Sequence, residues 1–438
     1  MAEPMPAPIE REWPAAIRAL RHRNFRFFWF GQMVSLVGTW MQNAAQSWLV
    51  LMLATTAYGA AHASFYVGMI GAAGSAPMFL FCLVGGVVSD RTDRRRILLV
   101  TQSSLMLLAL GLGLLVSTGT VRLWHVAIFS ACSGLAMAFD MPTRQAFVKD
   151  MASPRDLLNA IALNSIIFNL ARIFGPALAG QMIKQQDIHL GHLFGASRLT
   201  IPFGIPGALY VNAASFLAVI AGLFLIRYRR APTPPSDNNL WQHLGEGFRY
   251  VLRNQTILLL LLVIATFSIF GFSYAVLMPV VAKHVLHQNA GGYGWLMGAA
   301  GLGATIGAAL LACTGGRLRK GRVLFWGALI CSLGLLGFGM SHTYWLSLVI
   351  LLFVGGGLVV ASACVNSMIQ EIVPDQLRGR VVSIWALVFA GFSPLGAIYA
   401  GIVANATTPG CSVFLGGVAC LVVLSIITLK SRWLWSIR

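Results

Sequence analysis

The sequence predicts an all-α membrane protein in which twelve transmembrane helices form two pseudo-symmetric six-helix bundles. The first observation is composition: 57% of the 438 residues are hydrophobic and only 10% are charged, against about 25% charged residues in soluble domains. The second is that apolar runs long enough to cross a bilayer recur along the whole chain. The third is that short motifs of the first half return in the second half.

The apolar runs give the number of spans. A membrane-spanning helix needs about 20 mostly apolar residues, and twelve runs satisfy this length. We expect the spans at 26–53, 64–88, 97–117, 122–141, 157–184, 206–226, 256–282, 292–313, 322–340, 343–368, 380–403 and 411–430. The eighth and tenth spans are rich in glycine, and small residues let neighbouring membrane helices approach closely.

The basic residues predict the orientation of these spans. If the N-terminus is cytoplasmic, 26 of the 31 Lys and Arg residues fall in the N-terminal segment, the cytoplasmic loops and the C-terminus. This positive-inside bias predicts that both termini are cytoplasmic. It also explains the net charge of +18 without a nucleic acid, because the basic residues are divided among short loops beside lipid head groups.

Several other classes of protein are disfavoured. The segment before the first span is polar and basic, so we expect no cleavable signal peptide. The seven cysteines are scattered without a CxxC pair and are interpreted as small apolar residues. The sequence contains no HExxH, GxSxG or Walker A motif and no repeated channel filter. We therefore expect neither an enzyme nor a channel, and no metal or cofactor.

A cytoplasmic segment divides the chain into two halves. Residues 227–255 contain the Pro- and Asn-rich stretch APTPPSDNN and then LWQHLGEGFRYVLRNQ, whose apolar residues follow a helical period. The second stretch predicts an amphipathic helix on the inner leaflet. We expect a six-helix half at 1–226, which includes a basic N-terminal segment, the linker and helix at 227–255, and a second six-helix half at 256–438.

The two halves repeat each other weakly. GGVVSDRTDRRR (85–96) follows the second span, and GGRLRKGR (315–322) follows the eighth. GPALAG (175–180) lies in the fifth span, and SPLGAIYAG (393–401) lies in the eleventh. Internal repeats of this kind are typical of secondary transporters, whose substrate site lies near the bilayer midplane between the repeats.

The motif after the second span resembles the loop signature of the major facilitator superfamily. Gly86, Asp90, Arg91, Arg94 and Arg95 match that signature, and Asp93 replaces its second glycine. GPALAG resembles the Gly-Pro motif of export-type members. RNFRFFWFGQMVSLVGTWMQNAAQSWLV, FDMPTRQAF and PDQLRGRVVS are similar to drug and siderophore exporters, which include the enterobactin exporters. The resemblance implies an exporter of the bacterial inner membrane, with the major facilitator fold and rocking halves. We expect a monomer.

The resemblance also implies a gating latch, which holds the halves in the outward-facing state. We expect it to comprise Gly86, Asp90, Arg91, Arg94, Arg95, Asp140, Arg144 and Arg378. A carboxylate at the end of a span pairs with basic side chains and favours the N-terminus of a facing helix. The alternative is that RTDRRR only sets topology and binds lipid head groups.

A polar stripe runs along the first span. Six polar side chains fall within roughly 100° of arc on a helix, and they are Gln32, Ser35, Thr39, Gln42, Asn43 and Gln46. An unpaired amide is costly in lipid, so this face meets protein or water. We predict that it lines the substrate cavity. The alternative is hydrogen bonding that joins the first span to its neighbours.

The fifth span carries three more candidates, Asn164, Asn169 and Arg172. Arg172 lies fifteen residues beyond the start of the span, which is about 22 Å at 1.5 Å per residue and past the midplane of a ~30 Å core. An arginine at this depth indicates a functional site, so we predict that these three residues line the cavity. A structural hub of hydrogen bonds is the alternative.

Two proline sites are expected to bend helices in equivalent spans of the two halves. They are Gly175-Pro176 and Pro394. Proline frees a main-chain carbonyl and kinks a helix, and such kinks shape the outer cavity of a rocking transporter. The alternative is an ordinary tolerated bend.

The positions of the carboxylates indicate the charge of the substrate. All thirteen Asp and Glu residues lie in loops, tails or predicted span ends, whereas cation exporters usually need one near the midplane. We therefore expect an anionic or neutral, hydrogen-bonding and aromatic substrate, such as a catecholate siderophore or a macrolide-like compound. Asp140, then Glu371, would carry a coupling proton. An importer and a non-transporting receptor or scaffold are the alternatives to a proton-coupled exporter.

Overall fold

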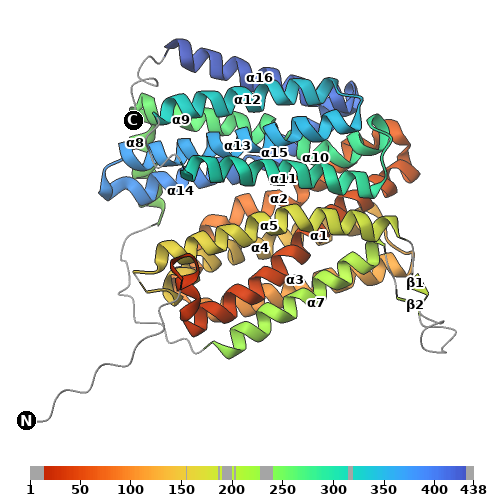
Figure 1. The fold of residues 1–438 in the computed structure, drawn as a ribbon, viewed down its shortest axis with the longest axis horizontal. Helices are drawn as coiled ribbons and strands as arrows, with labels where there is room; N and C mark the ends of the chain where they lie inside the picture. Colours follow the sequence, from red (N-terminus) through yellow and green to blue (C-terminus); the bar gives the residue numbers. More distant parts are fainter. Residues whose placement is uncertain are drawn as a thin grey trace, which may run out of the picture.

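The computed structural model describes residues 14–153, 155–185, 188–189, 200–201, 204–226, 240–313 and 319–430. The described residues are helical except for loops and two short antiparallel strands, β1 (Ile188–His189) and β2 (Thr200–Ile201), between the fifth and sixth spans. Figure 1 shows the helices stacked in two groups, α1 to α7 below and α8 to α16 above. We call these groups the N half and the C half.

The N half contains one short 3-10 helix and six long helices. They are η1 (Ala15–Arg21), α1 (Arg23–Tyr58), α2 (Ala60–Arg91), α3 (Arg94–Ser117), α4 (Leu123–Met151), α5 (Leu157–Lys184) and α7 (Ile205–Leu225). Helix α1 packs against α5 and α7, and α4 packs against α2 and α3.

The C half has a more interrupted set of helices. They are α8 (Leu240–Arg253), α9 (Gln255–Thr266), η2 (Phe267–Gly271), α10 (Ser273–Val280), η3 (Val281–Val285), α11 (Ala290–Cys313), α12 (Lys320–Met340), α13 (Tyr344–Ile372), α14 (Asp375–Gly391), α15 (Ser393–Ala406) and α16 (Pro409–Lys430). The seventh span runs from α9 to η3 and contains two π-helical segments, η2 and η3. The eleventh span consists of α14 and α15.

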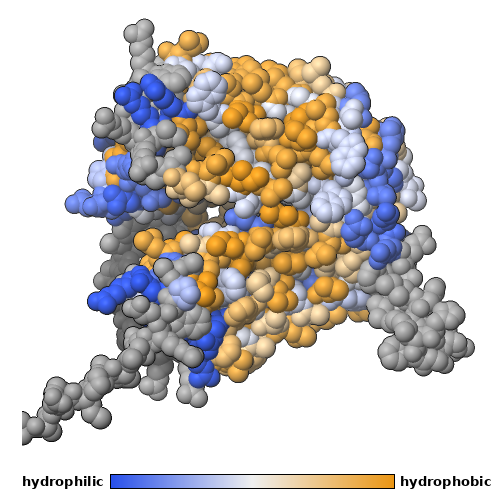
Figure 2. All heavy atoms as spheres, viewed as in Figure 1, coloured by the Kyte–Doolittle hydropathy of each residue, from blue (hydrophilic) through white to orange (hydrophobic). Residues whose placement is uncertain are grey.

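The prediction of twelve membrane helices is confirmed. Among the described residues, eleven helical segments are long and apolar enough to cross a membrane, and they include every predicted span except the first. Helix α1 is the twelfth, with 36 residues. Its polar stripe lowers its hydropathy, which is why it falls outside the apolar set. Figure 2 shows the apolar belt of the molecule between two polar ends.

The two ends of the bundle differ in charge. The basic end is where α1 begins at Arg23 and α2 ends at Arg91, and the far end is where α1 ends at Tyr58. In Figure 1 the basic end is on the left, with α8 and α14, and the far end is on the right, with β1 and β2. The boundaries 1–226, 227–255 and 256–438 stay a prediction, and 227–239 lie outside the described residues.

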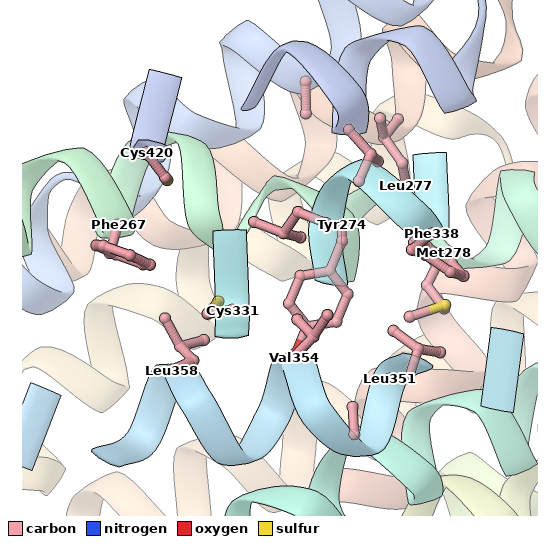
Figure 3. Packing of buried hydrophobic residues seen from close by; sticks show 14 of the residues in the cluster. Phe267, Tyr274, Leu277, Met278, Cys331, Phe338, Leu351, Val354, Leu358 and Cys420 are labelled. Atoms are coloured by element: carbon pink, nitrogen blue, oxygen red, sulfur yellow. The ribbon is translucent and has the colours of Figure 1, made fainter. Parts of the chain in front are cut away.

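An apolar core fills the C half. In Figure 3, Phe267, Tyr274 and Cys331 pack together with side chains of α13 and α16. Cys331, like Cys364 and Cys420, is buried and free, as expected for a small apolar residue. Phe267 and Tyr274 are 3% and 1% exposed, so both aromatic side chains belong to this core.

Two boundaries differ from the prediction in a way that matters. Helix α4 continues ten residues past the predicted end of the fourth span, to Met151. Asp140 therefore lies about 16 Å from the end of its helix, and its place at the end of the membrane span stays a prediction. The predicted amphipathic helix is α8. It packs on α14 at Gly247, buries Val251 and exposes Leu252.

Candidate functional site

The polar stripe of α1 divides into a buried part and an exposed part. Gln32 and Ser35 are buried inside the N half, and Asn43 is exposed. Thr39, Gln42 and Gln46 are partly buried, and the Thr39 hydroxyl donates to the main-chain carbonyl of Ser35. The stripe therefore points partly into the N half and partly away from it.

Gln32 takes part in a buried charged network. Its carbonyl oxygen accepts a hydrogen bond from Arg144, which also pairs with Asp140 one turn earlier on α4. Asp140 is fully buried and accepts further hydrogen bonds from Thr101 at 2.8 Å and Gln102 at 2.7 Å. Three helices, α1, α3 and α4, are thus joined around one carboxylate.

Two other amides of the stripe bond to neighbouring helices. The Asn212 amide on α7 donates to Gln42, and Gln46 donates to Ser130 on α4 at 2.6 Å. These contacts agree with the alternative of interhelical hydrogen bonding for those side chains. The prediction that the stripe lines a cavity is carried most directly by the exposed Asn43.

Arg172 lies where the two halves meet. Its guanidinium carbon is 5.9 Å from the ring centre of Trp40, and its side chain lies near Tyr274 on α10. Gly301 on α11 faces it: a Cβ there would lie 3.3 Å from Cγ of Arg172. Among the described ion pairs, none includes Arg172. Its neighbours include the aromatic face of Trp40 and the glycine at position 301.

The other predicted residues of α5 lie closer to the basic end. Asn164 and Asn169 are partly buried, and the Asn169 amide donates to the Ser165 carbonyl of the preceding turn at 2.8 Å. With Arg172 they occupy the half of α5 that runs from its start to the middle of the bundle. Their role in the cavity stays a prediction.

The halves contact each other closely towards the far end. Trp48 of α1 stacks on Tyr293 of α11 with ring centres 5.7 Å apart. A Cβ on Gly68 of α2 would lie 2.5 Å from the Ala397 carbonyl oxygen and 2.6 Å from the Cα of Gly401, so backbone touches backbone between α2 and α15. This far-end seam closes the molecule on one side.

The predicted latch residues form contacts at the basic end within the N half. Arg94 pairs with Asp150 at 2.8 Å and with Asp90 at 3.2 Å. The Arg95 side chain donates to the carbonyl of Leu223 at the end of α7. Asp93, which replaces the signature glycine, caps α3 by accepting from the Arg95 main-chain N–H.

The remaining latch residues are more open. Arg91 and the Asp90 side chain are exposed, and a Cβ on Gly86 would meet open space. In the C half, Arg378 pairs with Asp375 and donates to the Gln370 carbonyl. Asp140 and Arg144 belong instead to the buried network inside the N half. The latch itself stays a prediction.

The two proline sites differ in structure. The eleventh span breaks at Phe392, and Pro394 stands in the first turn of α15. Helix α5 remains continuous through Pro176. Proline lacks the N–H that would bond the carbonyl of Arg172 four residues earlier, and that oxygen lies against Gly301. Gly175 lets α1 approach, because a Cβ there would lie 2.5 Å from the Cβ of Trp40.

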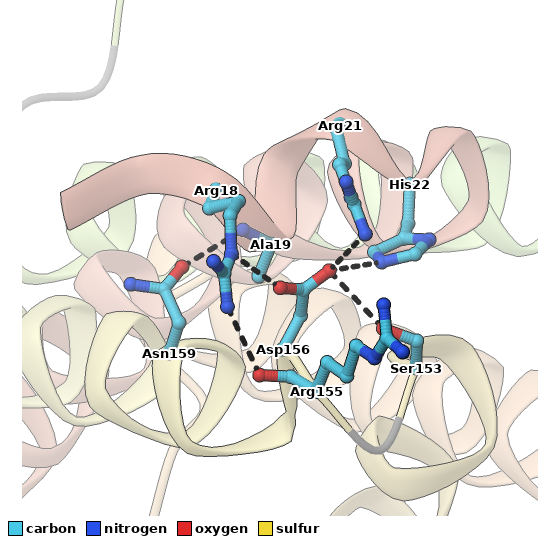
Figure 4. Close-up of polar contacts among 8 residues, drawn as sticks. All are labelled: Arg18, Ala19, Arg21, His22, Ser153, Arg155, Asp156 and Asn159. Atoms are coloured by element: carbon cyan, nitrogen blue, oxygen red, sulfur yellow. Dashed lines mark hydrogen bonds and ion pairs between the residues drawn. The ribbon is translucent and has the colours of Figure 1, made fainter. Parts of the chain in front are cut away.

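A buried carboxylate at the start of α5 was not predicted as a site. Figure 4 shows Asp156 between the basic side chains of η1 and of His22, which follows it: Arg18 lies 2.6 Å away, His22 2.8 Å and Arg21 3.0 Å. The His22 hydrogen bond, supported by Arg18, Ser153 and Arg21, lowers the pKa of Asp156 to about 2, although burial opposes this. The basic run before the first span was interpreted only as an orientation signal, and its partner lies 138 residues away.

The described residues hold no group of three or more His, Cys, Asp and Glu side chains suited to a metal ion. The expectation of no metal or cofactor therefore stays a prediction.

The chain resembles known siderophore transporters along most of its length. It is 24% identical to the staphyloferrin A transporter of Staphylococcus aureus over 385 residues, which cover 87% of this chain and 89% of that protein. It is 21% identical to the enterobactin exporter EntS of Escherichia coli over 416 residues, covering 94% and 93%.

Solved structures share the fold. A bacterial homologue of the human lysosomal transporter Spinster, in an inward-facing and occupied conformation, matches with a TM-score of 0.71 at 15% identity, covering 94% of this chain and 97% of that one. A D-xylose-proton symporter matches with a TM-score of 0.67 at 12% identity, covering 95% and 97%. The family of transmembrane secretion effectors matches residues 15–434. The chain is therefore a transporter of the major facilitator superfamily and belongs to the transmembrane secretion effector family.

Proposed function

We propose that this transporter exports a small amphipathic molecule, anionic or neutral and siderophore-like or drug-like, across the bacterial inner membrane in exchange for protons. The basic end faces the cytoplasm, so both termini are cytoplasmic. The halves 1–226 and 256–438 rock about a central site, and residues 227–255 connect them. The siderophore-transporting relatives support the substrate class.

The distribution of contacts supports an inward-facing state in the structure. The far-end seam joins Gly68 to Gly401 and Trp48 to Tyr293, and Figure 2 shows a hollow between the halves nearer the basic end. In this state the substrate enters from the cytoplasm. We propose that Asp90 and its arginines close the latch when the basic end shuts, because Asp90 lies exposed at the basic end beside Arg94.

The proposed charge of the substrate is inferred from Arg172. It is a half-buried cation at the meeting of the two halves, and no described carboxylate pairs with it. An anionic or phenolic oxygen would accept a charge-assisted hydrogen bond there, and Trp40 offers an aromatic face beside it. Asn43, Asn164 and Asn169 would supply further hydrogen bonds.

Asp140 is the residue that we propose for the coupling proton. It is a fully buried carboxylate in a network that reaches α1 through Arg144 and Gln32. Protonation of Asp140 would release Arg144 and so change the contacts of α1, which carries the stripe. Glu371 is less suited, because it is exposed and pairs with Lys320.

The test is flux through purified protein in proteoliposomes. Vesicles would receive a catecholate siderophore, a neutral macrolide or a lipophilic cation, each labelled, with an imposed pH gradient of either sign. We expect the siderophore or macrolide to cross the membrane in the direction opposite to the flow of protons. Transport of the cation alone would overturn the proposed substrate class. Substrate movement only in the same direction as the protons would indicate an importer. Binding of the substrate without flux would indicate a receptor.

Two variants assign the roles. Arg172→Gln should weaken siderophore binding by about 10- to 100-fold, the worth of one charge-assisted hydrogen bond, whereas Arg172→Lys should retain part of it. Asp140→Asn should abolish the dependence on the pH gradient but leave binding intact. If Arg172→Gln binds the siderophore like wild type, Arg172 is structural and the site lies elsewhere.

A further inference from the structure

A groove on the lipid-facing side of the C half lies outside the proposed transport path. It runs between α11, α12 and α13 and has a volume of about 940 Å³, within the range of about 300–1,000 Å³ for ligand pockets. Ile306, Trp326 and Phe353 stand beside it and are 48%, 58% and 57% exposed. Side chains this apolar and this exposed face hydrocarbon in a bilayer.

Glycines hollow the floor of this groove. A Cβ on Gly307 would lie 2.7 Å from the Gly356 carbonyl oxygen, and one on Gly303 would lie 1.9 Å from the Leu352 carbonyl oxygen. Helices α11 and α13 therefore touch through their backbones. The floor between them is flat, while the larger side chains form walls, which leaves a slot shaped for a linear chain.

Two arginines line the groove at the basic end. Arg319 and Arg322, at the start of α12, are both exposed. Lys320 lies between them in sequence but pairs with Glu371, so its charge is already neutralised. Among the described ion pairs, none includes Arg322. The groove thus joins an apolar slot to a positive rim at the level of lipid head groups.

The N half has a counterpart at the equivalent position. A second groove of about 710 Å³ lies between α2, α3 and α4 and also opens near the basic end. Val100 and Leu107, which line it, are 66% and 62% exposed. Arg96 at its rim lies 3.9 Å from the Asp93 carboxylate, and its side chain is 83% exposed and open to a further anion. In each half the groove lies between the second, third and fourth spans.

We propose that these two grooves bind anionic phospholipids of the leaflet at the basic end. One acyl chain lies in the slot, and the phosphate meets Arg319 and Arg322 in the C half or Arg96 in the N half. Charge complementarity favours an anionic over a zwitterionic head group, since each basic residue near an anionic lipid surface contributes to binding. A soluble phosphate would leave the apolar slot unfilled.

The test is native mass spectrometry of the purified full chain, titrated with phosphatidylglycerol or phosphatidylcholine of the same acyl chains. Wild type should bind two phosphatidylglycerol molecules in preference to phosphatidylcholine. Arg319→Gln/Arg322→Gln should weaken one of the two sites by about 25-fold, which is about fivefold for each arginine. The control Arg253→Gln removes an exposed arginine of α8 outside both grooves and should leave both sites unchanged.

A second pair of variants tests the slot without changing charge. Ile306→Trp fills the groove, and Leu217→Trp adds the same bulk at an exposed lipid-facing position of α7. Only Ile306→Trp should lose the C-half lipid. Equal losses in both variants, an equal loss in Arg253→Gln, unchanged binding in Arg319→Gln/Arg322→Gln, or displacement by glycerol phosphate would each overturn the proposal.

Discussion

The interiors of the two halves differ although their folds are related. The N half buries two amides from α1 and α3, the carboxylates of Asp140 and Asp156, and the amide of Asn212. In the described part of the C half, apart from tyrosine and cysteine, the buried polar residues are all serine or threonine. Most of their hydroxyls bond main-chain carbonyls: Ser332, for example, donates to Ala328 one turn earlier at 2.8 Å.

This difference shows that pseudo-symmetry fixes the arrangement of helices but not the chemistry between them. A hydroxyl that bonds a carbonyl of its own helix adds no constraint between helices. A side-chain network such as Asp140, Arg144 and Gln32 ties three helices together, and it is costly when it is incomplete. The N half is therefore the half in which a change of protonation can be passed from one helix to another.

The largest loss of unfolding free energy is expected when the charged network around Asp140 is broken. Arg144→Met leaves the Asp140 carboxylate buried without its cation, which should cost about 3–5 kcal/mol of unfolding free energy, measured by denaturant titration in mixed micelles. Arg380→Met is the control in the C half, because its partner Glu246 is half exposed and the loss should stay within about 1 kcal/mol. Adding Asp140→Asn to Arg144→Met should recover stability; no recovery would contradict the assignment.

A smaller loss is expected when a neutral donor of the same network is removed. Gln102→Leu deletes one of the two neutral donors to Asp140 and should cost about 1–3 kcal/mol in the same titration. Leucine is close to glutamine in size, and an apolar side chain suits this position because Gln102 is fully buried. If Gln102→Leu costs no more unfolding free energy than Ser332→Ala in the C half, the contrast between the halves is wrong.

Interhelical amides away from a charge should matter less. Asn212→Leu breaks the hydrogen bond to Gln42 and should cost about 0.6 kcal/mol, with 1.7 kcal/mol as the upper end for membrane helices. The matched change Asn405→Leu removes an exposed bond to His62 at the far end and should be silent. If the two variants unfold alike, burial does not set the difference.

Asp156 gives a prediction that depends on pH. Its pKa is lowered to about 2, so the stability that it contributes is present above about pH 4 and is lost as the pH falls towards 2. His22→Ala removes the largest cause and should flatten this acid loss, measured by thermal unfolding between pH 6 and pH 2. Asp156→Asn should abolish this contribution. An unchanged acid slope in both variants would assign the loss to other groups.

The smallest effect belongs to the C half. Ser332→Ala deletes a hydroxyl whose acceptor, the Ala328 carbonyl, keeps its own helical hydrogen bond. We expect a change of about 0.6 kcal/mol or less in the denaturant titration. A loss as large as that of Gln102→Leu would show that the C half holds a polar network after all.

Local patterns were enough to predict the helices, because twelve apolar runs and their basic flanks are each read within a few tens of residues. The partners of the polar groups were not predictable in this way. Gln32 meets Arg144 112 residues further along the chain, and the stripe alone does not distinguish a cavity wall from a bond to a neighbour. The π-helical segments η2 and η3 had no local signal that periodicity could detect.

The far-end seam has a consequence for the conditions in which the protein works. Its close contacts are backbone against backbone at Gly68 and Gly401 and ring against ring at Trp48 and Tyr293, and neither kind carries a formal charge. Dissolved ions screen charged pairs strongly but leave such contacts almost untouched. The far-end seam should therefore stay equally tight at low and at high ionic strength, in dilute fresh water as in brine.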